Sequence, residues 1–238
     1  MKKISLALLT VWCMIVLSSC RRVVGEGPTI TQKRSTSDFT GVEMDVPGDL
    51  YYTPGNLFSV EIVAQQNILD LIETNVTADD ILRVKVRNSV NIKSHEPVIV
   101  KVTAPNLKWL GVNGSGNVNV LESFQPASLT LSVNGSGDMT LARLNTEDLQ
   151  ARISGSGNIR VHAGSGTRET LSISGSGDID AAGYVVADAT TSSSGSGSMR
   201  VNVTSNLECK ISGSGSVMYK GTPKVTTKIS GSGRVEPL

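Results

Sequence analysis

A glycine-serine-glycine triplet recurs in seven regularly spaced copies between residues 114 and 233, at intervals of 21, 20, 20, 20, 18 and 18 residues. A near-constant period of this length is typical of a solenoid, in which each repeat forms one coil and packs against its neighbours. Glycine adopts backbone angles that other residues avoid, so we expect the chain to turn sharply at each triplet. The predicted turn glycines are Gly114, Gly116, Gly135, Gly137, Gly155, Gly157, Gly175, Gly177, Gly195, Gly197, Gly213, Gly215, Gly231 and Gly233.

Apolar and polar residues alternate on both sides of the triplet, which is the pattern of a β-strand with one buried face. An apolar residue stands two positions before the first glycine in six of the seven copies, and two positions after the second glycine in all seven. We therefore predict an all-β fold: a right-handed parallel β-helix, or solenoid, with coils of about 20 residues that turn at the repeated Gly-Ser-Gly corners.

Some positions within the repeat carry more specific expectations. The central serine of each corner is expected to form a ladder of hydroxyl groups along the stack. Gly164-Ser165-Gly166 falls outside the regular spacing and is interpreted as a local loop. Thr191 and Ser193 occupy inward columns of the fifth copy, so we expect that coil to be the loosest. Cys209 also lies in an inward column and is interpreted as a small buried residue.

The chain before the repeat is predicted to contain a signal peptide at residues 1–19 and a tether at residues 20–35. Residues 36–238 then form a single domain, with a capping β region at 36–105 and the repeat coils at 106–238. Such a cap would cover the end of the stack, where an open edge would otherwise recruit other chains. Alternating patterns within the cap predict strands near residues 42–46, 58–64, 81–86 and 98–102, and one or two helical turns within 67–72.

The N-terminus has the pattern of a secretory signal. Lys2 and Lys3 precede an apolar stretch from Ile4 to Leu17, which is too short to span a bilayer comfortably. Leu17-Ser18-Ser19-Cys20 then resembles a bacterial lipobox, which implies that Cys20 is acylated and becomes the mature N-terminus. The alternative is an ordinary signal peptide with a chance cysteine.

The lipobox predicts a cell-envelope protein whose partner is the outer membrane, held through a lipid anchor on Cys20. Surface export of lipoproteins in the Bacteroides group is linked to acidic residues just after the cysteine, and Arg21 and Arg22 stand there instead. This favours the periplasmic face of the membrane over the cell surface.

Three blocks of the chain resemble a known family: FTGVEMDVPGDLYYTPGN, FSVEIVAQQNILDLIETNV and VIVKVTAPNLKWLGVNGSGNV, the last leading into the serial turns. The family is DUF2807, also called the putative auto-transporter adhesin head, or GIN, domain, and the resemblance covers residues 36–238. It implies a β-helical fold in cell-envelope proteins, often lipoproteins of the Bacteroidetes. The adhesin name carries no agreed ligand and no catalytic residues that could be transferred to this chain.

Composition and residue counts argue against several site types. The chain has 22 Lys and Arg against 21 Asp and Glu, so it lacks the basic surplus expected of a nucleic-acid-binding protein. Two histidines and one remaining cysteine cannot build a convincing structural zinc site. Calcium β-rolls need aspartate at successive turns, whereas only Asp138 and Asp178 follow a corner here. We predict no metal, no cofactor and no catalytic residue.

Three functions stay open. The first is a non-enzymatic envelope lipoprotein whose rigid β-helical surface contacts a glycan or an envelope protein. The second is a carbohydrate-active enzyme, a lyase or glycosidase, which would need two carboxylates less than about 10 Å apart in a groove. The third is a structural or regulatory sensor module of the periplasm. The outward column Asn119, Thr140, Arg160, Asp180 and Arg200 alternates in charge and is expected to form solvated ion pairs.

Overall fold

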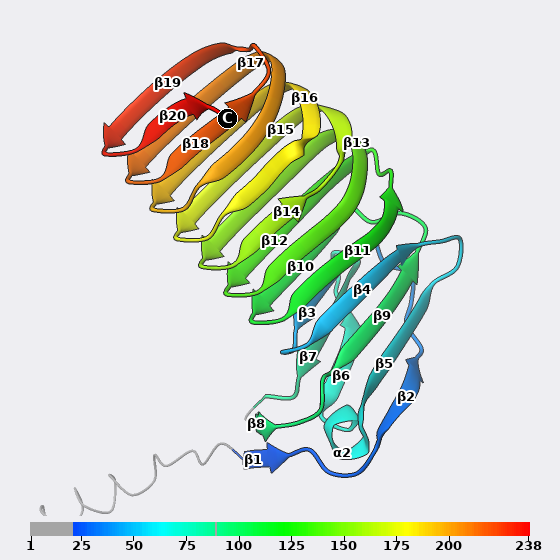
Figure 1. Cartoon of the computed structure of the whole chain (residues 1–238). Helices are drawn as coiled ribbons and strands as arrows, with labels where there is room; N and C mark the ends of the chain where they lie inside the picture. The colour runs from blue at the N-terminus through cyan, green and yellow to red at the C-terminus, as the bar shows by residue number, and fades with distance from the viewer. Residues whose placement is uncertain (1–20, 89) are drawn as a thin grey trace, which may run out of the picture.

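The computed structural model describes residues 21–238 apart from residue 89, so the predicted signal peptide and Cys20 lie outside the described residues. Within that range the chain is mostly β-strand and contains one short helix. The strands wind into a solenoid whose coils stack in parallel along one axis (Figure 1). The predicted parallel β-helix is confirmed.

The repeat coils are built from eleven strands, each paired in parallel with the equivalent strand one coil away. A strand that enters a corner ends on the corner's first glycine, and the next strand begins one or two residues after its second glycine. The strands are β10 (Trp109–Gly114), β11 (Asn117–Phe124), β12 (Ser128–Gly135), β13 (Asp138–Gly155), β14 (Asn158–Val161), β15 (Gly164–Gly175), β16 (Ile179–Gly195), β17 (Met199–Gly213), β18 (Ser216–Lys220), β19 (Lys224–Gly231) and β20 (Arg234–Pro237).

Four inward columns form the core of the solenoid, as the alternation predicts. In the column two residues before the corner, Val112 and Val133 are fully buried, and Ile153, Ile173 and Ile211 are at most 2% exposed. Burying one such aliphatic side chain stabilises the fold by about 1.5–3 kcal/mol, so each added coil extends the core. Only at the last coil does this column open, where Ile229 is 42% exposed.

The fifth coil carries polar residues in this core. Ser193 is 3% exposed, and its hydroxyl is buried without a hydrogen-bond partner. Thr191 is fully buried and makes one long bond, from its hydroxyl to the carbonyl of Glu208 at 3.5 Å. A buried hydroxyl without a partner costs stability, so the expectation that this coil is the loosest stays a prediction with a structural basis.

The backbone, and not the serine side chains, forms the ladder at the corners. The first glycine of each corner has φ between 95° and 147°. Its carbonyl accepts two hydrogen bonds from the next coil, as Gly135 does from the N–H groups of Ser156 at 2.8 Å and Gly157 at 3.1 Å. The corner serines are all exposed, so the predicted ladder of hydroxyls is wrong. The reason is that their backbone N–H groups already meet the neighbouring coil, while their side chains point to solvent.

Gly164-Ser165-Gly166 is also not a loop. These residues open strand β15, which pairs with β13 on one side and β16 on the other. A Cβ atom on Gly166 would meet the hydroxyl of Tyr184 and the carbonyl of Thr146. The triplet therefore allows close packing within the stack, at a position outside the main corner.

Residues 36–105 form more than a cap, because they contain two further coils. Strands β3 (Gly41–Asp45) and β4 (Asp49–Pro54) make one coil, and β7 (Ile81–Val86) and β9 (Ile99–Ala104) make the other. The first lies between the second and the repeat coils, since β3 pairs with both β7 and β10. The repeat pattern misses this coil because it turns at Val46-Pro47-Gly48 instead of Gly-Ser-Gly.

Antiparallel strands then close the N-terminal end of the stack. β5 (Ser59–Gln65) pairs with β9, β2 (Thr29–Arg34) pairs with β5, and β6 (Ile72–Val76) pairs with β7, all antiparallel. The short helix α2 (Gln66–Leu69) follows β5 and buries Ile68 and Leu69. It agrees with the predicted helical turns, and the antiparallel strands cover edges that would otherwise be free to pair.

The segment 20–35, expected to be a tether, contains two strands. β2 is one of the closing strands, and β1 (Arg21–Val24) pairs in parallel with β8 (Val90–Ser94) in a separate small sheet. Figure 1 shows β1 and β8 beside α2, at the end of the stack remote from β19 and β20. None of the described helices has the length and apolar character needed to cross a membrane.

A matched pair of corner variants tests the backbone ladder. Gly155→Ala places a methyl group against the carbonyl of Gly135 at a φ of 132°, so we expect the free energy of unfolding to fall by at least about 2 kcal/mol. Ser156→Ala removes only an exposed hydroxyl and should change it by less than about 0.5 kcal/mol. Denaturant unfolding followed by circular dichroism measures both; equal losses would contradict a backbone ladder.

Candidate functional site

The outward residues of the strands that enter the corners form one continuous polar surface along the stack. Strand register aligns the residues one, three and five positions before each corner into columns. We call this surface the hydroxyl face. Its serine and threonine residues are Thr130, Ser132, Ser154, Thr170, Ser172, Ser174, Thr190, Ser192, Ser194, Ser212, Thr226 and Ser230.

Most of these side chains are exposed or half-buried, and only Ser132, at 7% exposure, is buried. The threonine hydroxyls that hydrogen-bond within the described residues, such as those of Thr191 and Thr204, lie elsewhere. The hydroxyls of the face are therefore available to water or to a ligand. Because the strands are paired, equivalent hydroxyls repeat at about 4.8 Å from coil to coil.

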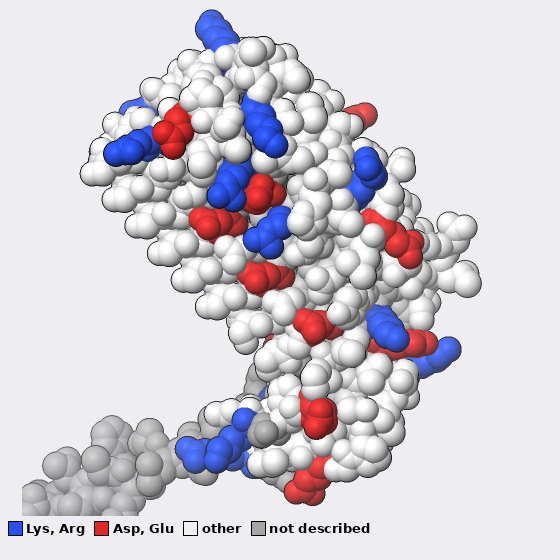
Figure 2. Space-filling model, in the orientation of Figure 1, with Lys and Arg blue, Asp and Glu red and all other residues white. Residues whose placement is uncertain are grey.

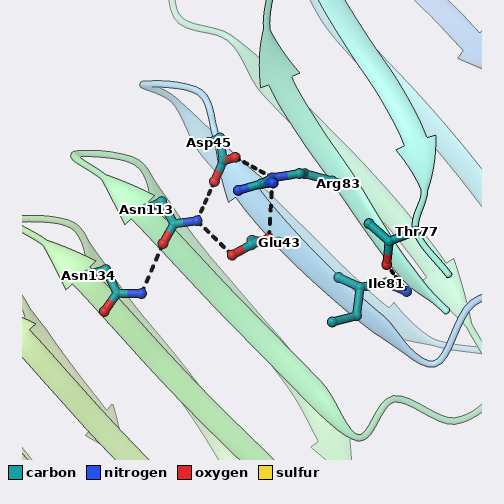
Figure 3. Close-up of polar contacts among 7 residues, drawn as sticks. All are labelled: Glu43, Asp45, Thr77, Ile81, Arg83, Asn113 and Asn134. Carbon is teal, nitrogen blue, oxygen red and sulfur yellow. Dashed lines mark hydrogen bonds and ion pairs between the residues drawn. The ribbon is translucent and has the colours of Figure 1, made fainter. Parts of the chain in front are cut away.

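At its N-terminal end the hydroxyl face passes into a charged cluster, drawn in Figure 3, which we call the Asn113 cluster. Asn113 donates from Nδ2 to Glu43 Oε1 and to Asp45 Oδ1, both at 2.6 Å. Arg83, one coil further, donates from Nε to Asp45 Oδ2 at 2.6 Å and lies 3.3 Å from Glu43 Oε2. Asn134 extends the network by donating to Asn113 Oδ1 at 3.0 Å.

The cluster joins three coils that lie far apart in the sequence. Glu43 and Asp45 come from β3, Arg83 from β7 and Asn113 from β10. The hydrogen bond to Asp45, together with the negative charges of Asp45 and Glu43, raises the pKa of Arg83. Sequence reasoning missed this group because nothing in the spacing of residues 43, 83 and 113 shows that their strands are neighbours.

Glu43 and Asp45 satisfy the distance requirement set for an enzyme, but their surroundings do not suit catalysis. Each oxygen lies 2.6 Å from the same nitrogen, so the two oxygens are within twice that distance of each other. Both carboxylates also lie against the guanidinium of Arg83, so their oxygens are already engaged in contacts within the protein.

Trp109 adds an aromatic ring to the same end of the hydroxyl face. A Cβ atom on Gly111 would come 2.8 Å from Trp109 Nε1, and one on Gly41 would come 2.9 Å from Trp109 Cβ. The indole thus lies over two glycines, one on its own strand and one on the neighbouring coil. Its Nε1 is buried there without a hydrogen-bond partner, and the side chain as a whole is partly exposed.

The column that directly follows each corner forms a second ladder. Asn117 Oδ1 accepts from the N–H of Asp138 at 3.2 Å, Asp138 Oδ1 from that of Asn158 at 3.0 Å, and Asp178 Oδ1 from that of Ser198 at 2.7 Å. Asparagine and aspartate at these positions therefore join neighbouring coils. In the part of the chain that the structure describes, no group of three His, Cys, Asp or Glu residues is placed to hold a metal ion.

Charged residues elsewhere on the coils form local pairs. Arg200 lies 3.4 Å from Asp180, in the column predicted to alternate in charge, and Arg168 lies 2.7 Å from Asp148. Acidic and basic side chains are interspersed over the coils in Figure 2, and most of the stepped edge formed by the corners carries neither. Exposed pairs of this kind contribute little stability and create no strong field of one sign.

Cys209 is fully buried between Thr191 and Thr227, and burial raises the pKa of its thiol. The interpretation of this residue as a small core residue is therefore confirmed.

Glu169 is a buried ionisable side chain that the alternation of apolar and polar residues did not predict. It is 1% exposed, and both of its carboxylate oxygens are buried without a hydrogen-bond partner. In its column it lies between Leu149 and Ala189, where an apolar residue is expected. Burial raises the pKa of Glu169 well above 4.5. Burial is also the main cause of the raised pKa of the neighbouring Tyr184, to which the charge of Glu169 contributes less.

Comparison with known proteins identifies relatives for most of the chain. The family model described as "Putative auto-transporter adhesin, head GIN domain" (DUF2807) matches residues 38–223. A "putative adhesin" from Bacteroides fragilis superposes with a TM-score of 0.84 at 23% identity, covering 91% of this chain and 100% of that one.

Two proteins from Parabacteroides distasonis are also similar. A "putative adhesin" has a TM-score of 0.75 at 26% identity and covers 91% of this chain and 100% of its own. A "putative lipid binding protein" has a TM-score of 0.77 at 21% identity and covers 92% and 100%. Likeness at such identities supports the fold, and no curated protein matches the chain.

The buried carboxyl of Glu169 gives a test by pH. Its pKa is higher in the folded protein than in the unfolded one. The contribution of Glu169 to the free energy of unfolding is therefore most favourable below about pH 4.5, and it is lost as the pH rises through the pKa of the folded state. We expect Glu169→Leu, which matches Leu149 and Leu207 in the same column, to be more stable than the parent at pH 8.

The stability difference between parent and variant should shrink steadily as the pH is lowered to 4. Denaturant titrations across this range measure the difference, and Glu147→Leu, at an exposed position, is the control. A difference that does not change with pH would show that Glu169 is ionised in the folded protein.

Proposed function

Because the chain belongs to the DUF2807 family of putative auto-transporter adhesin head domains, we propose that it is a non-enzymatic binding module of the cell envelope whose hydroxyl face binds glycans. The observation that carries this proposal is the face itself. Its serine and threonine hydroxyls repeat on successive coils, are exposed or half-buried for the most part, and are not used by the protein's own hydrogen bonds.

The rigidity of the coils suits this role. Each hydroxyl is held by a paired strand, and all but those on β19 by a strand that is paired on both sides, so little backbone freedom is lost when a ligand binds. Serine and threonine hydroxyls both donate and accept hydrogen bonds, as the hydroxyls of a sugar do. A surface with one repeat per coil can contact a ligand that is itself a chain of repeating units. Trp109, at the end of the face, offers part of an aromatic ring for stacking.

The module is proposed to be a lipoprotein anchored through Cys20 in the outer membrane, on its periplasmic side. β1 begins at Arg21 and pairs with β8, so an anchor at Cys20 would lie next to the closed N-terminal end of the stack. The repeat coils would then extend away from the membrane, with the last coil, β19 and β20, farthest from it. An outward position of this kind makes the hydroxyl face accessible.

A carbohydrate-active enzyme is the second candidate, because Glu43 and Asp45 lie close together on the outer surface. The same binding assay separates the two functions when released products are measured by chromatography. A binding module leaves the oligosaccharides intact. An enzyme cleaves them, and Glu43→Gln would abolish that cleavage.

Binding to the face is tested with soluble residues 21–238 and a set of neutral oligosaccharides of glucose, galactose and N-acetylglucosamine. Ser174→Arg places a large side chain at the centre of the face and should weaken binding by about tenfold or more, equivalent to about 1.4 kcal/mol. Isothermal titration calorimetry measures the affinity.

Thr140→Arg is the matched control, because it introduces the same side chain on a strand that leaves the corner. Equal effects of the two variants, or capture of an envelope protein in place of any glycan, would contradict the proposed use of the hydroxyl face.

The anchor has its own test in cells. Cys20→Ala should move the protein from the membrane fraction to the soluble fraction, because the acylated side chain is lost. Cys209→Ala, at a buried core position, should leave the protein with the membrane. Fractionation followed by immunoblotting measures both, and membrane retention of Cys20→Ala would remove the basis for a lipid anchor.

A further inference from the structure

Two lysines lie directly opposite each other near the distal end of the hydroxyl face. Lys210 on β17 and Lys228 on β19 are register partners, in the outward column three residues before the corner. Neighbouring strands are about 4.8 Å apart, and like charges at such positions destabilise a sheet. On the two preceding coils the same column holds Ser172 and Ser192, so the basic pair belongs to the last two coils alone.

The charge of this pair is only partly balanced. Lys210 Nζ lies 2.8 Å from Glu208 Oε1, two residues earlier on the same strand. Within the described residues, no carboxylate lies within ion-pair distance of Lys228. One carboxylate thus balances the charge of Lys210 and none balances that of Lys228, so the surface at this pair carries a net positive charge.

The lysines line a hollow in the face. It has a volume of about 270 Å³, and its lining includes the serines of three successive coils. Ser194, Ser212 and Ser230 occupy one column beside the lysines, and all three side chains are exposed. The hollow thus combines two cationic donors with a row of neutral donors, which together suit an anionic group of several oxygens.

Protection of the sheet edge explains only part of this arrangement. β19 is the last strand of its sheet, and lysine on an edge strand discourages pairing with other chains. That accounts for Lys224 and Lys228. It does not account for Lys210, which lies on β17, a strand paired on both sides. A second lysine placed opposite the first adds repulsion without any gain in edge protection.

We propose that this hollow binds the anionic substituent of an acidic glycan, a carboxylate or a sulfate, and so determines which glycans the hydroxyl face selects. The proposal rests on the proposed function, since it names the ligand class for that same face. The ammonium groups of Lys210 and Lys228 bind the anion from two coils, and the serine hydroxyls complete its hydrogen bonds. Neutral units of the same glycan then lie along the columns of serine and threonine.

The experiment compares three oligosaccharide probes of equal length: neutral dextran, sulfated dextran and polygalacturonate, the last carrying carboxylates. Affinities are measured by calorimetry with residues 21–238, at low and high salt. We expect the acidic probes to bind at least tenfold more tightly than the neutral one, with an advantage that salt reduces. The difference between sulfated dextran and polygalacturonate shows which anion the hollow prefers.

Two variants locate the effect. Lys228→Gln should remove most of the advantage of the acidic probes and leave the affinity for neutral dextran unchanged. Lys224→Gln lies on the same strand, outside the lining of the hollow, and should change neither. Circular dichroism verifies that both variants are folded.

The outcomes separate this inference from the function on which it rests. Equal binding of acidic and neutral probes, or equal effects of the two lysine variants, would overturn the anion site and leave the glycan-binding face intact. If none of the three probes binds, this inference fails, and the proposed function fails with it only if the neutral oligosaccharides of galactose and N-acetylglucosamine do not bind either.

Discussion

Backbone pairing between successive corners is the interaction on which the rest of the structure depends. The carbonyl of each first glycine accepts two N–H groups from the coil that follows, and this repeats from Gly114 to Gly213. A Cβ atom on the next first glycine would meet that same carbonyl, so each first glycine that stacks on an earlier corner, from Gly135 onward, must lack a side chain. The glycine columns are therefore a steric condition for stacking, and the strands on either side inherit their register from it.

A scaffold that is held by its backbone and core leaves its outer columns free to vary. The inward columns are apolar with few exceptions, whereas the outward columns hold a mixture of hydroxyls and charged residues, with hydroxyls most frequent on the middle strands that enter the corners. The Asn113 cluster joins the N-terminal coils, and the pair Lys210 and Lys228 marks the last two. The kind of polar side chain on the outer surface thus changes along the axis of the solenoid, while the strands keep the distance between successive side chains constant.

The two ends of the solenoid differ in how completely they are covered. The N-terminal end is closed by antiparallel strands and α2, and β1 lies beside them. The other end exposes part of its core at Ile229, and its edge strand β19 carries Lys224 and Lys228. A module anchored at Cys20 would therefore place its closed end at the membrane and its more open, charged end away from it.

Local rules account for what the repeat pattern predicted correctly. Alternation assigned the inward columns, and the burial of Val112, Ile153 and Cys209 follows from it. The same rules wrongly assigned a ladder of hydroxyl groups to the corner serines, because a hydroxyl ladder and a backbone ladder both predict the same repeated Gly-Ser-Gly triplet. They also missed the coil of β3 and β4, whose turn contains Pro47, and the order of the first coils, in which β3 lies between β7 and β10.

The sequence by itself determined the repeating unit: where the chain turns, which side chains face inward, and that the coils stack in parallel. These properties depend on residues that are close in the sequence or one repeat apart, so they can be predicted from the sequence alone. Only the tertiary structure decided which distant residues meet, such as Glu43, Arg83 and Asn113, and that Glu169 is buried without a partner. The reason is that coil order and side-chain contacts depend on three-dimensional packing, in which separation along the chain carries no information about distance in space.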